Sequence, residues 1–355
     1  MAERKIVKEY TEHTYVTYMR DKFHAYDSWV ESQGIPVLSG SHVADARTVE
    51  LGHWESRGAQ GALLSFSDQR VVDGYICEVA PGASLSPHRQ LYEELVVILE
   101  GHGSTEVWYE GTGVRSFEWG KGAVFSIPIN AWHRHHNSSG TTPIRYVALT
   151  SAPPIIEFFR DHEFLFNNDF AFAERFDPED PEFFDKPGEY LTEYYGGVLD
   201  TNFISDIRTI RLVPREARGK GNHNMYIHIA GSTMFAHVSQ FPVGTFKKAH
   251  RHGPGAHIIM LDSTGYTMMW RDGEEPTRYD WAEGSILSPP EGVWHQHYNT
   301  GNEPCRFVAL HASVAMRSAG DGGVEQLDDF DDQNRFLESM YVEECARNGV
   351  EVVSR

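Results

Sequence analysis

Histidine is the residue type in this chain whose number and spacing point most directly to chemistry. The sequence holds 19 histidines in 355 residues, and His250, His252 and His257 fall within one short segment. A fourth, His295, follows a Pro-Glu-Gly turn. Alternate residues of a strand share a face, so a His-x-His on a strand turns both rings the same way. Imidazole suits iron, copper, nickel, manganese and zinc, and we expect these four histidines to converge on a divalent transition metal.

An internal repeat organises the rest of the chain. A shift of 162 residues aligns GASLSPHRQ at 82–90 with GTFKKAHRH at 244–252, and GAVFSIPINAWHRHHN at 122–137 with GSILSPPEGVWHQHYN at 284–299. Self-similarity at a fixed spacing is the signature of repeated structural units. The chain is therefore a duplicated unit.

The repeat unit is predicted to be all-β. Short apolar runs such as ELVVIL, AVFSIP and RYVALT alternate with Gly, Pro, Asn or Asp turns at intervals of about 8 to 12 residues, as in barrels and sandwiches. Near the C-terminus, DDFDDQNRFLESMYVEECARNG has acids in its first turn, an apolar stripe and a glycine stop, and it predicts one amphipathic helix. The connector is too aromatic for a disordered tether, and we expect it to pack across both units.

These patterns divide the chain into five predicted parts. They are an N-terminal extension at 1–50, a first barrel at 51–152, the aromatic-rich connector at 153–215, a second barrel at 216–315 and a C-terminal helical extension at 316–355.

Composition excludes several classes of partner. Lys and Arg total 31 against 51 Asp and Glu, a net charge of -20 that disfavours nucleic acid and anionic lipid. The three cysteines form no paired motif, which favours a reducing compartment. The N-terminal segment lacks the apolar core of a signal peptide, and no run approaches the roughly 18 apolar residues of a membrane span. We expect a cytoplasmic protein with a small-molecule substrate.

The repeated motifs resemble the two signature motifs of the cupin superfamily. The first copy reads Gly82-x5-His88-x-Gln90-x3-Glu94-x6-Gly101, then Gly122-x5-Pro128-x4-His133-x3-Asn137. The second reads Gly244-x5-His250-x-His252-x4-His257, then Gly284-x5-Pro290-x-Gly292-x2-His295-x3-Asn299. The chain thus resembles a bicupin, which implies two tandem jelly-roll (double-stranded β-helix) barrels. In the family the metal ligands are both histidines of a His-x-His, a glutamate shortly after it and a histidine of the second motif.

The two copies depart from this ligand set differently. In the first, Gln90 replaces the second histidine, so the resemblance implies a possible second metal site at His88, Gln90, Glu94 and His133. Two histidines and a carboxylate can hold non-haem iron, while a barrel kept only for structure is the competing interpretation. In the second copy, His257 stands where the family usually has glutamate. The spacing of that glutamate varies by one residue in the family, and if His257 does not face inward, His250, His252 and His295 still form a three-histidine site.

A set of neutral imidazoles favours one kind of chemistry. It leaves both positive charges on the ion, which then attracts an anionic, bidentate substrate. All-histidine cupins of this kind resemble gentisate-type and diketone-type dioxygenases, whereas the oxalate decarboxylase branch keeps its glutamates. We therefore expect a metal-dependent oxidoreductase, an Fe(II) dioxygenase acting on a small aromatic or dicarbonyl-like substrate, with Mn, Ni, Cu or Zn as other metals.

Two other functions stay open at this point. One is a non-redox cupin isomerase or lyase, and the other is a non-catalytic bicupin that binds a small molecule. His297 has the strand parity to lie behind the ligands, and Arg306, which recurs as Arg145 in the first copy, suggests a salt bridge or a carboxylate anchor. The resemblance also implies a homodimer, because bicupins often pair through their barrels.

Overall fold

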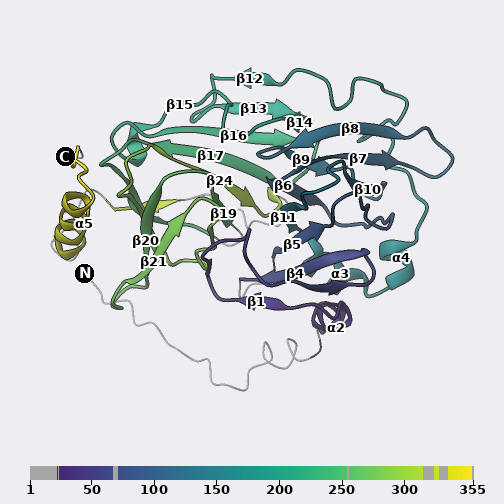
Figure 1. Ribbon diagram of the computed structural model, residues 1–355, viewed down its shortest axis with the longest axis horizontal. Coiled ribbons are helices and arrows are strands. Elements are labelled where there is room, and N and C mark those ends of the chain that lie inside the picture. The colour runs from purple at the N-terminus through teal and green to yellow at the C-terminus, as the bar shows by residue number, and fades with distance from the viewer. Residues whose placement is uncertain are drawn as a thin grey trace, which may run out of the picture.

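Two β-barrels lie side by side in the computed structural model, which describes residues 22, 24–66, 71–253, 256–314, 324–327 and 335–353 (Figure 1). The predicted all-β fold of two tandem barrels is confirmed. The short helices gather at the far end of the N-terminal barrel, and one helix lies against the outer side of the C-terminal barrel. The helices are α2 (Ala25–Ser32), α3 (Ala152–Phe159), α4 (His162–Phe166), a 3-10 turn (Glu216–Arg218) and α5 (Arg335–Arg347).

The N-terminal barrel is built from a large and a small sheet. In spatial order, the large sheet contains β1 (Val37–Ser39), β4 (Ala59–Ser65), β5 (Asp73–Val79), β11 (Ile144–Thr150), β6 (Glu94–Glu100), β9 (Val124–Ile127) and β14 (Phe203–Ile204), with β3 (Gly52–Trp54) beside β4. The small sheet contains β10 (Trp132–Asn137), β7 (His102–Trp108) and β8 (Arg115–Gly120).

The C-terminal barrel repeats this design. Its large sheet contains β12 (Glu189–Leu191), β13 (Val198–Thr201), β16 (His223–Ile229), β17 (Phe235–Phe241), β24 (Cys305–His311), β19 (Ala256–Met260), β22 (Ile286–Leu287) and β2 (His42–Val43), with β15 (Val213–Pro214) beside β16. Its small sheet contains β21 (Thr277–Ala282), β20 (Thr264–Trp270), β23 (Trp294–Asn299), β18 (Phe246–Arg251) and β25 (Glu325–Gln326).

The barrels exchange short strands. β2 comes from the N-terminal extension but pairs with β22 of the C-terminal barrel, and β14 comes from the connector but pairs with β9 of the N-terminal barrel. The connector also adds β12 and β13 to the C-terminal sheet. Its Phe184 ring stacks on Phe117 of the N-terminal barrel at 4.0 Å between centroids. The connector therefore packs on both barrels.

Residue alternation along the strands separates two kinds of core. On β6, Leu95 and Val97 pack into a core shared by the two large sheets, while Val96 and Ile98 pack inside the N-terminal barrel. Sheets that pack face to face interdigitate in this way. A shift of one residue in the register of β6 would exchange the two sets. An odd or an even place on the strand therefore decides whether a side chain reaches the barrel interior.

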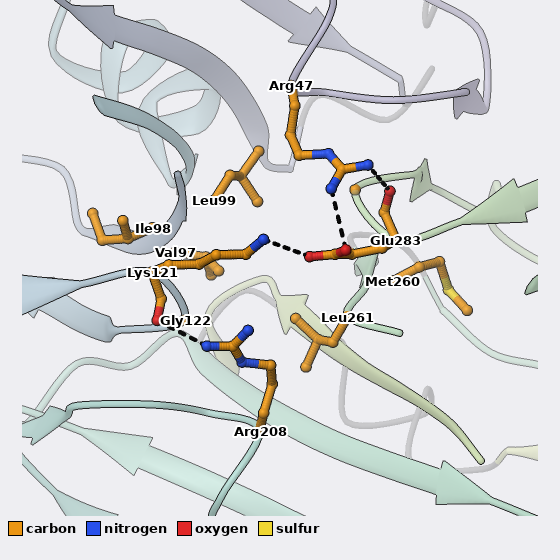
Figure 2. Close-up of a pocket in the computed structure, with 11 residues that line it drawn as sticks. Arg47, Val97, Ile98, Leu99, Lys121, Gly122, Arg208, Met260, Leu261 and Glu283 are labelled. Carbon is orange, nitrogen blue, oxygen red and sulfur yellow. Dashed lines mark hydrogen bonds and ion pairs between the residues drawn. The ribbon is translucent and has the colours of Figure 1, made fainter. Parts of the chain in front are cut away.

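The seam between the barrels has approximate two-fold symmetry. Arg47 donates to the carbonyl of Glu283 at 2.8 Å, and its repeat equivalent Arg208 donates to the carbonyl of Lys121 at 3.2 Å. Lys121 and Glu283 are themselves equivalent under the 162-residue shift. Their side chains meet with Nζ 2.7 Å from a carboxylate oxygen (Figure 2). The two copies have diverged to opposite charge at the point where they face each other.

The predicted C-terminal helix is confirmed as α5. Tyr341 is buried against the C-terminal barrel, where its hydroxyl donates to the Asn299 carbonyl at 3.3 Å. The acidic start of the predicted segment, at 328–334, lies outside the described residues. In the described part of the chain, the helices are too short or too polar to cross a bilayer.

Candidate metal centre

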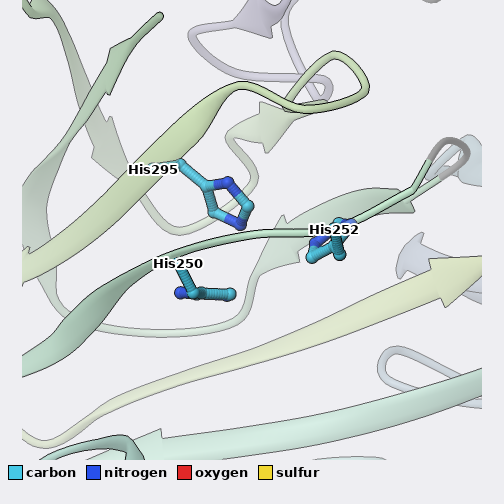
Figure 3. Close-up of side chains that lie close together, drawn as sticks. All are labelled: His250, His252 and His295. Atoms are coloured by element: carbon cyan, nitrogen blue, oxygen red, sulfur yellow. The ribbon is translucent and has the colours of Figure 1, made fainter. Parts of the chain in front are cut away.

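Three histidines of the C-terminal barrel converge in its interior. His250 on β18 is paired across the sheet with His295 on β23, and their ring centroids lie 4.2 Å apart. His252 lies just past the end of β18, with its ring 4.9 Å from that of His295. One nitrogen from each ring lies within 4.8 Å of the other two (Figure 3). No second group of His, Cys, Asp or Glu gathers this closely in the described ranges.

Backbone contacts fix the tautomer of all three rings. The acceptors of their Nδ1 atoms are the carbonyls of Lys248 (2.8 Å from His250), Gly253 (2.8 Å from His252) and Val293 (3.0 Å from His295). A neutral ring that donates from Nδ1 carries its lone pair on Nε2. Nε2 of His295 is buried with no hydrogen-bond partner among the described residues.

The electrostatics also fit metal binding. Burial, reinforced by the other histidine rings, lowers the pKa of His250 and His295 well below the usual range. The rings are therefore neutral, as metal ligands must be. Unpaired buried lone pairs are costly unless a ligand takes them. These three residues could thus hold a divalent transition metal.

His257 does not join this group. Alternate residues of β19 face opposite ways, and His257 shares a face with Ile259 of the inter-barrel core. Its ring lies 5.4 Å from the Phe66 ring, and its Nδ1 lies 3.5 Å from the Ser288 hydroxyl. The expected set of four histidines is therefore corrected to three, because strand parity turns the fourth ring toward the other barrel.

The inward-facing position at this point of β19 is Ala256. The 162-residue shift places Ala256 opposite Glu94. Glu94 shares a face of β6 with Val96 and Ile98 of the N-terminal interior. Ala256, and not His257, is thus the residue of this barrel that corresponds to the family's glutamate. The C-terminal centre has three imidazoles and no carboxylate from β19 among the described residues.

A cavity of about 80 Å³ adjoins the histidines, and nitrogen-bearing side chains make up much of its lining. Among the residues that line it are Arg215, Arg218, Lys247, His237, His250, His252 and His311. The Lys247 amine donates to the Ser239 hydroxyl at 3.2 Å. Burial, with Arg218 and Arg215 close by, lowers the pKa of Lys247 well below its usual range. The positive charge of the cavity therefore rests on Arg215 and Arg218, which suit it to an anion.

The N-terminal barrel keeps two histidines in the same tautomer. Nδ1 of His88 lies 2.8 Å from the Ser86 carbonyl, and Nδ1 of His133 lies 3.1 Å from the Ala131 carbonyl. Their ring centroids are 4.1 Å apart. This arrangement matches that of His250 and His295.

The other two predicted donors of the N-terminal barrel bond to each other. The Gln90 amide donates to Glu94 at 3.4 Å. Nε2 of His88 accepts a hydrogen bond from the Arg57 guanidinium. The structure therefore does not bring His88, Gln90, Glu94 and His133 together as a metal set, because an arginine occupies the nitrogen that would bind the ion.

Comparisons with known proteins agree with this architecture. The cupin domain family matches residues 75–150, from β5 to β11. The fold is shared with a mutant of Bacillus subtilis oxalate decarboxylase (TM-score 0.51, 11% identity, covering 86% of this chain and 84% of that one). It is also shared with Lactobacillus farciminis oxalate decarboxylase in a formate complex (TM-score 0.52, 12% identity, 86% and 93% covered).

The chain thus matches the cupin domain family over residues 75–150 and shares its overall two-barrel fold with these decarboxylases. A segment of 62 residues is also 36% identical to gentisate 1,2-dioxygenase from Ralstonia sp.. That match spans 17% of this chain and only 16% of the dioxygenase. At these identities the oxalate decarboxylases share the fold of this chain, and its chemistry has to be argued from its own side chains.

The structure separates the two predicted neighbours of the centre. His297 is buried beside the ligands, with its ring 5.6 Å from that of His295 and its Nδ1 2.7 Å from the Thr267 hydroxyl. Arg306 instead donates to the backbone carbonyls of Arg208 and Ile210, so it fixes this part of the connector to β24. Of the two expectations for Arg306, the structural one fits, with backbone carbonyls as partners in place of a carboxylate, and the substrate anchor does not.

The arginines that line the two cavities are not predicted by the histidine motifs, although a second repeat in the sequence marks one pair of them. At a shift of 161 residues, Glu55-Ser56-Arg57-Gly58 aligns with Glu216-Ala217-Arg218-Gly219. Arg57 and Arg218 are therefore repeat equivalents, and each lines the cavity of its own barrel. For His237 and His311, which lie 2.8 Å apart between ring nitrogens, the motifs offered no signal.

Proposed function

We propose that the C-terminal barrel of this bicupin binds one divalent transition metal, preferably Fe(II), and oxidises a small anionic substrate with O₂ as a dioxygenase. The observation that carries the proposal is the group of three neutral histidines with Ala256 in place of a carboxylate. A bound ferrous ion would supply redox chemistry and open positions for substrate and oxygen.

The protein's own side chains would select the substrate by charge. Three neutral ligands leave the double positive charge of an ion uncompensated. Arg215 and Arg218 present guanidinium groups to the same cavity, and guanidinium binds carboxylates through paired hydrogen bonds. A small aromatic hydroxy acid or a 1,3-dicarbonyl enolate has the anionic, chelating oxygens that this arrangement favours.

Two relatives support different parts of this proposal. The short match to gentisate 1,2-dioxygenase supports oxygen chemistry on an aromatic acid. Bacillus subtilis oxalate decarboxylase, which has Mn(II) centres, supports metal binding in this fold. The absence of a β19 carboxylate at the described histidine group favours the dioxygenase over the decarboxylase.

Metal and oxygen measurements test the proposal. The protein is purified without added metal, its metal content is determined, and oxygen uptake is followed with gentisate, salicylate and 1,3-diketones. We expect one iron per chain and oxygen consumption with at least one of these compounds. Zinc alone, together with no oxygen consumption, would contradict the proposal.

A buried amine favours a second candidate function. Lys247 lines the same cavity, and its pKa is depressed by burial. A neutral amine there could accept a proton from a metal-bound substrate, as a non-redox isomerase or lyase requires. Full turnover under anaerobic conditions would identify this alternative.

We also propose that the bicupin is a cytoplasmic homodimer. The three cysteines are free thiols, as a reducing compartment predicts. Four exposed phenylalanines lie on or beside α3 and α4, namely Phe158, Phe159, Phe164 and Phe170. Clustered exposed aromatic rings are typical of contact surfaces. Light scattering should report twice the mass of one chain, and a monomeric mass at micromolar concentration would contradict the dimer.

A further inference from the structure

The N-terminal barrel has a cavity of its own, of about 230 Å³. Its polar lining includes Arg57, His88, Arg89 and Gln90, and its aromatic lining consists of Trp29, Tyr92, Trp132, His162 and Phe166. The aromatic residues come from α2, α4 and the segment around the barrel mouth. This cavity is thus larger than the one beside the C-terminal histidines.

A guanidinium takes the place of the metal in this barrel. Arg57 is only 7% exposed, and it donates to Nε2 of His88. Its Cζ atom lies 5.0 Å from the Trp54 ring centroid and 5.5 Å from that of Tyr75, so aromatic faces hold the cation from the side. An ion and Arg57 cannot both use the His88 lone pair.

The cavity carries more positive than negative charge. Arg89 is a second buried cation, with Cζ 4.7 Å from the Trp132 ring and Nε without a hydrogen-bond partner among the described residues. Glu94 acts on Arg57 from the barrel interior, but among the described residues that line the cavity there is no Asp or Glu beside the two arginines. A buried excess of positive charge is costly unless an anion enters.

We propose that the N-terminal barrel is a metal-free binding site for a small aromatic carboxylate. The carboxylate pairs with Arg57 and Arg89, whose planar guanidinium groups can each donate two parallel hydrogen bonds. The ring lies against Trp29, Tyr92 and Phe166. The cavity is below the size of a typical drug-like ligand site, so the ligand has a single ring.

Calorimetric titration tests this site on the full-length protein as purified. The probes are benzoate and salicylate, with benzamide as the neutral analogue of the same shape. We expect benzoate to bind and benzamide not to bind. Arg57→Met should weaken benzoate binding by about tenfold or more, and Arg89→Met should weaken it in the same direction.

The repeat supplies the matched control. Arg218→Met removes the equivalent cation from the C-terminal cavity, so benzoate binding to the N-terminal barrel should persist in that variant. Arg134→Gln controls for loss of a surface arginine, because Arg134 pairs with Glu106 on the outside of the barrel. Arg57→Lys keeps the charge, and if Arg57→Met does not fold, an intermediate affinity in Arg57→Lys still supports the site.

Three results would overturn the proposal. The first is no carboxylate binding by the wild-type protein. The second is binding that Arg218→Met abolishes and Arg57→Met leaves intact, which would place the anion in the C-terminal barrel. The third, measurable without any variant, is a metal content of two equivalents per chain in the protein as purified.

Discussion

The two barrels share their strands and differ at a few interior positions. The cupin domain family matches residues 75–150 of the N-terminal barrel, whereas the histidine group lies in the C-terminal barrel. Both barrels keep a pair of facing histidines whose Nδ1 atoms are tied to backbone carbonyls. Both copies thus keep the backbone contacts that leave the lone pair of a histidine on Nε2. In the N-terminal barrel, Arg57 donates a hydrogen bond to this nitrogen of His88.

Three pairs of equivalent positions account for the difference. They are Arg57 with Arg218, Gln90 with His252, and Glu94 with Ala256. Arg57 donates to a ring nitrogen of His88, whereas Arg218 donates to the Gln326 side chain at 3.0 Å. In the N-terminal barrel the Arg57 guanidinium lies at the histidine pair, and in the C-terminal barrel we propose a metal ion at the equivalent position.

Removal of a ligand from the C-terminal centre should have the largest effect. His295→Ala removes one of three proposed donors, and we expect metal affinity to fall by more than about a hundredfold. Loss of a residue that only hydrogen-bonds to a ligand already costs up to about a hundredfold. Metal content per chain and oxygen uptake should fall together. His53→Ala is the control, because His53 is an exposed histidine whose ring contacts Glu55 and Gln60 on the surface. An unchanged metal content in His295→Ala would contradict the assigned centre.

Conversion of the N-terminal interior should create a second centre. Arg57→Met frees Nε2 of His88, and Gln90→His supplies the third imidazole, which together reproduce the C-terminal set. We expect the double variant to bind two metal equivalents per chain against one for the wild-type protein. Metal content after dialysis measures this. A folded double variant that stays at one equivalent would show that these two positions do not decide the difference.

Restoration of a carboxylate should reduce the preference for anions. Ala256→Glu places a negative charge where Glu94 lies in the other barrel, so an ion there would attract an anionic substrate less strongly. We expect metal to be retained and substrate or salicylate affinity for the centre to fall by about tenfold. Ala256→Gln has the same shape without the charge and separates charge from crowding. Equal effects of both variants would contradict the electrostatic explanation.

Local patterns predicted the scaffold and the three histidines that converge in the C-terminal barrel. The turn spacing and the repeat give the two barrels, and a His-x-His followed by a strand histidine gives His250, His252 and His295. The parity of β19 could not be predicted, because a spacing does not determine which residue begins a strand, and a slip of one residue reverses every side chain. That slip separates His257 from Ala256.

The positions of Arg57 and Arg218 could not be predicted in this way, because they depend on contacts between residues far apart in the sequence. Arg57 lies 31 residues before His88 in the sequence, on a turn between β3 and β4, and reaches it only in the closed barrel. The upstream repeat of Glu-x-Arg-Gly marks the position as shared by both copies. It does not determine that Arg57 enters a histidine site while Arg218 turns away.

Asp262 and Glu100 are equivalent residues with different surroundings. Glu100 pairs with Lys121 at 3.3 Å. Oδ1 of Asp262 is buried with no hydrogen-bond partner in the described part of the chain, and burial raises its pKa to about 6, despite Arg306 and Arg208 nearby. Since the folded pKa exceeds the unfolded value, this carboxyl favours folding at low pH, and that contribution is lost as the pH rises from about 4 to about 6.

Asp262→Asn should remove this penalty. We expect the variant to be more stable than wild type by about 1 kcal/mol at pH 8, a value reduced for partial solvent exposure, and nearly equal at pH 4. Chemical denaturation at the two pH values measures the difference, and other titrating groups cancel between the two proteins. Glu100→Gln should show no gain at pH 8. A pH-independent effect of Asp262→Asn would contradict the assignment to ionisation.

The smallest expected effect lies at the seam, where Lys121 meets Glu283. Both side chains are partly exposed, at 35% and 39%, so their coupling should be only about 0.5–1 kcal/mol. Lys121→Glu or Glu283→Lys alone brings like charges together and should lower the free energy of unfolding by about 1 kcal/mol in denaturant titrations.

The approximate two-fold symmetry predicts that the double exchange recovers this loss. Each charge would move to the equivalent site of the other barrel, where Arg47 and Arg208 stand in equivalent positions. The lysine placed at position 283 would also lie near Asp262, as Lys121 lies near Glu100, so the pKa of Asp262 should fall and the gain from Asp262→Asn at pH 8 should shrink. A double variant less stable than both single variants would mean that the seam depends on the particular shapes of Lys121 and Glu283 and not on their opposite charge.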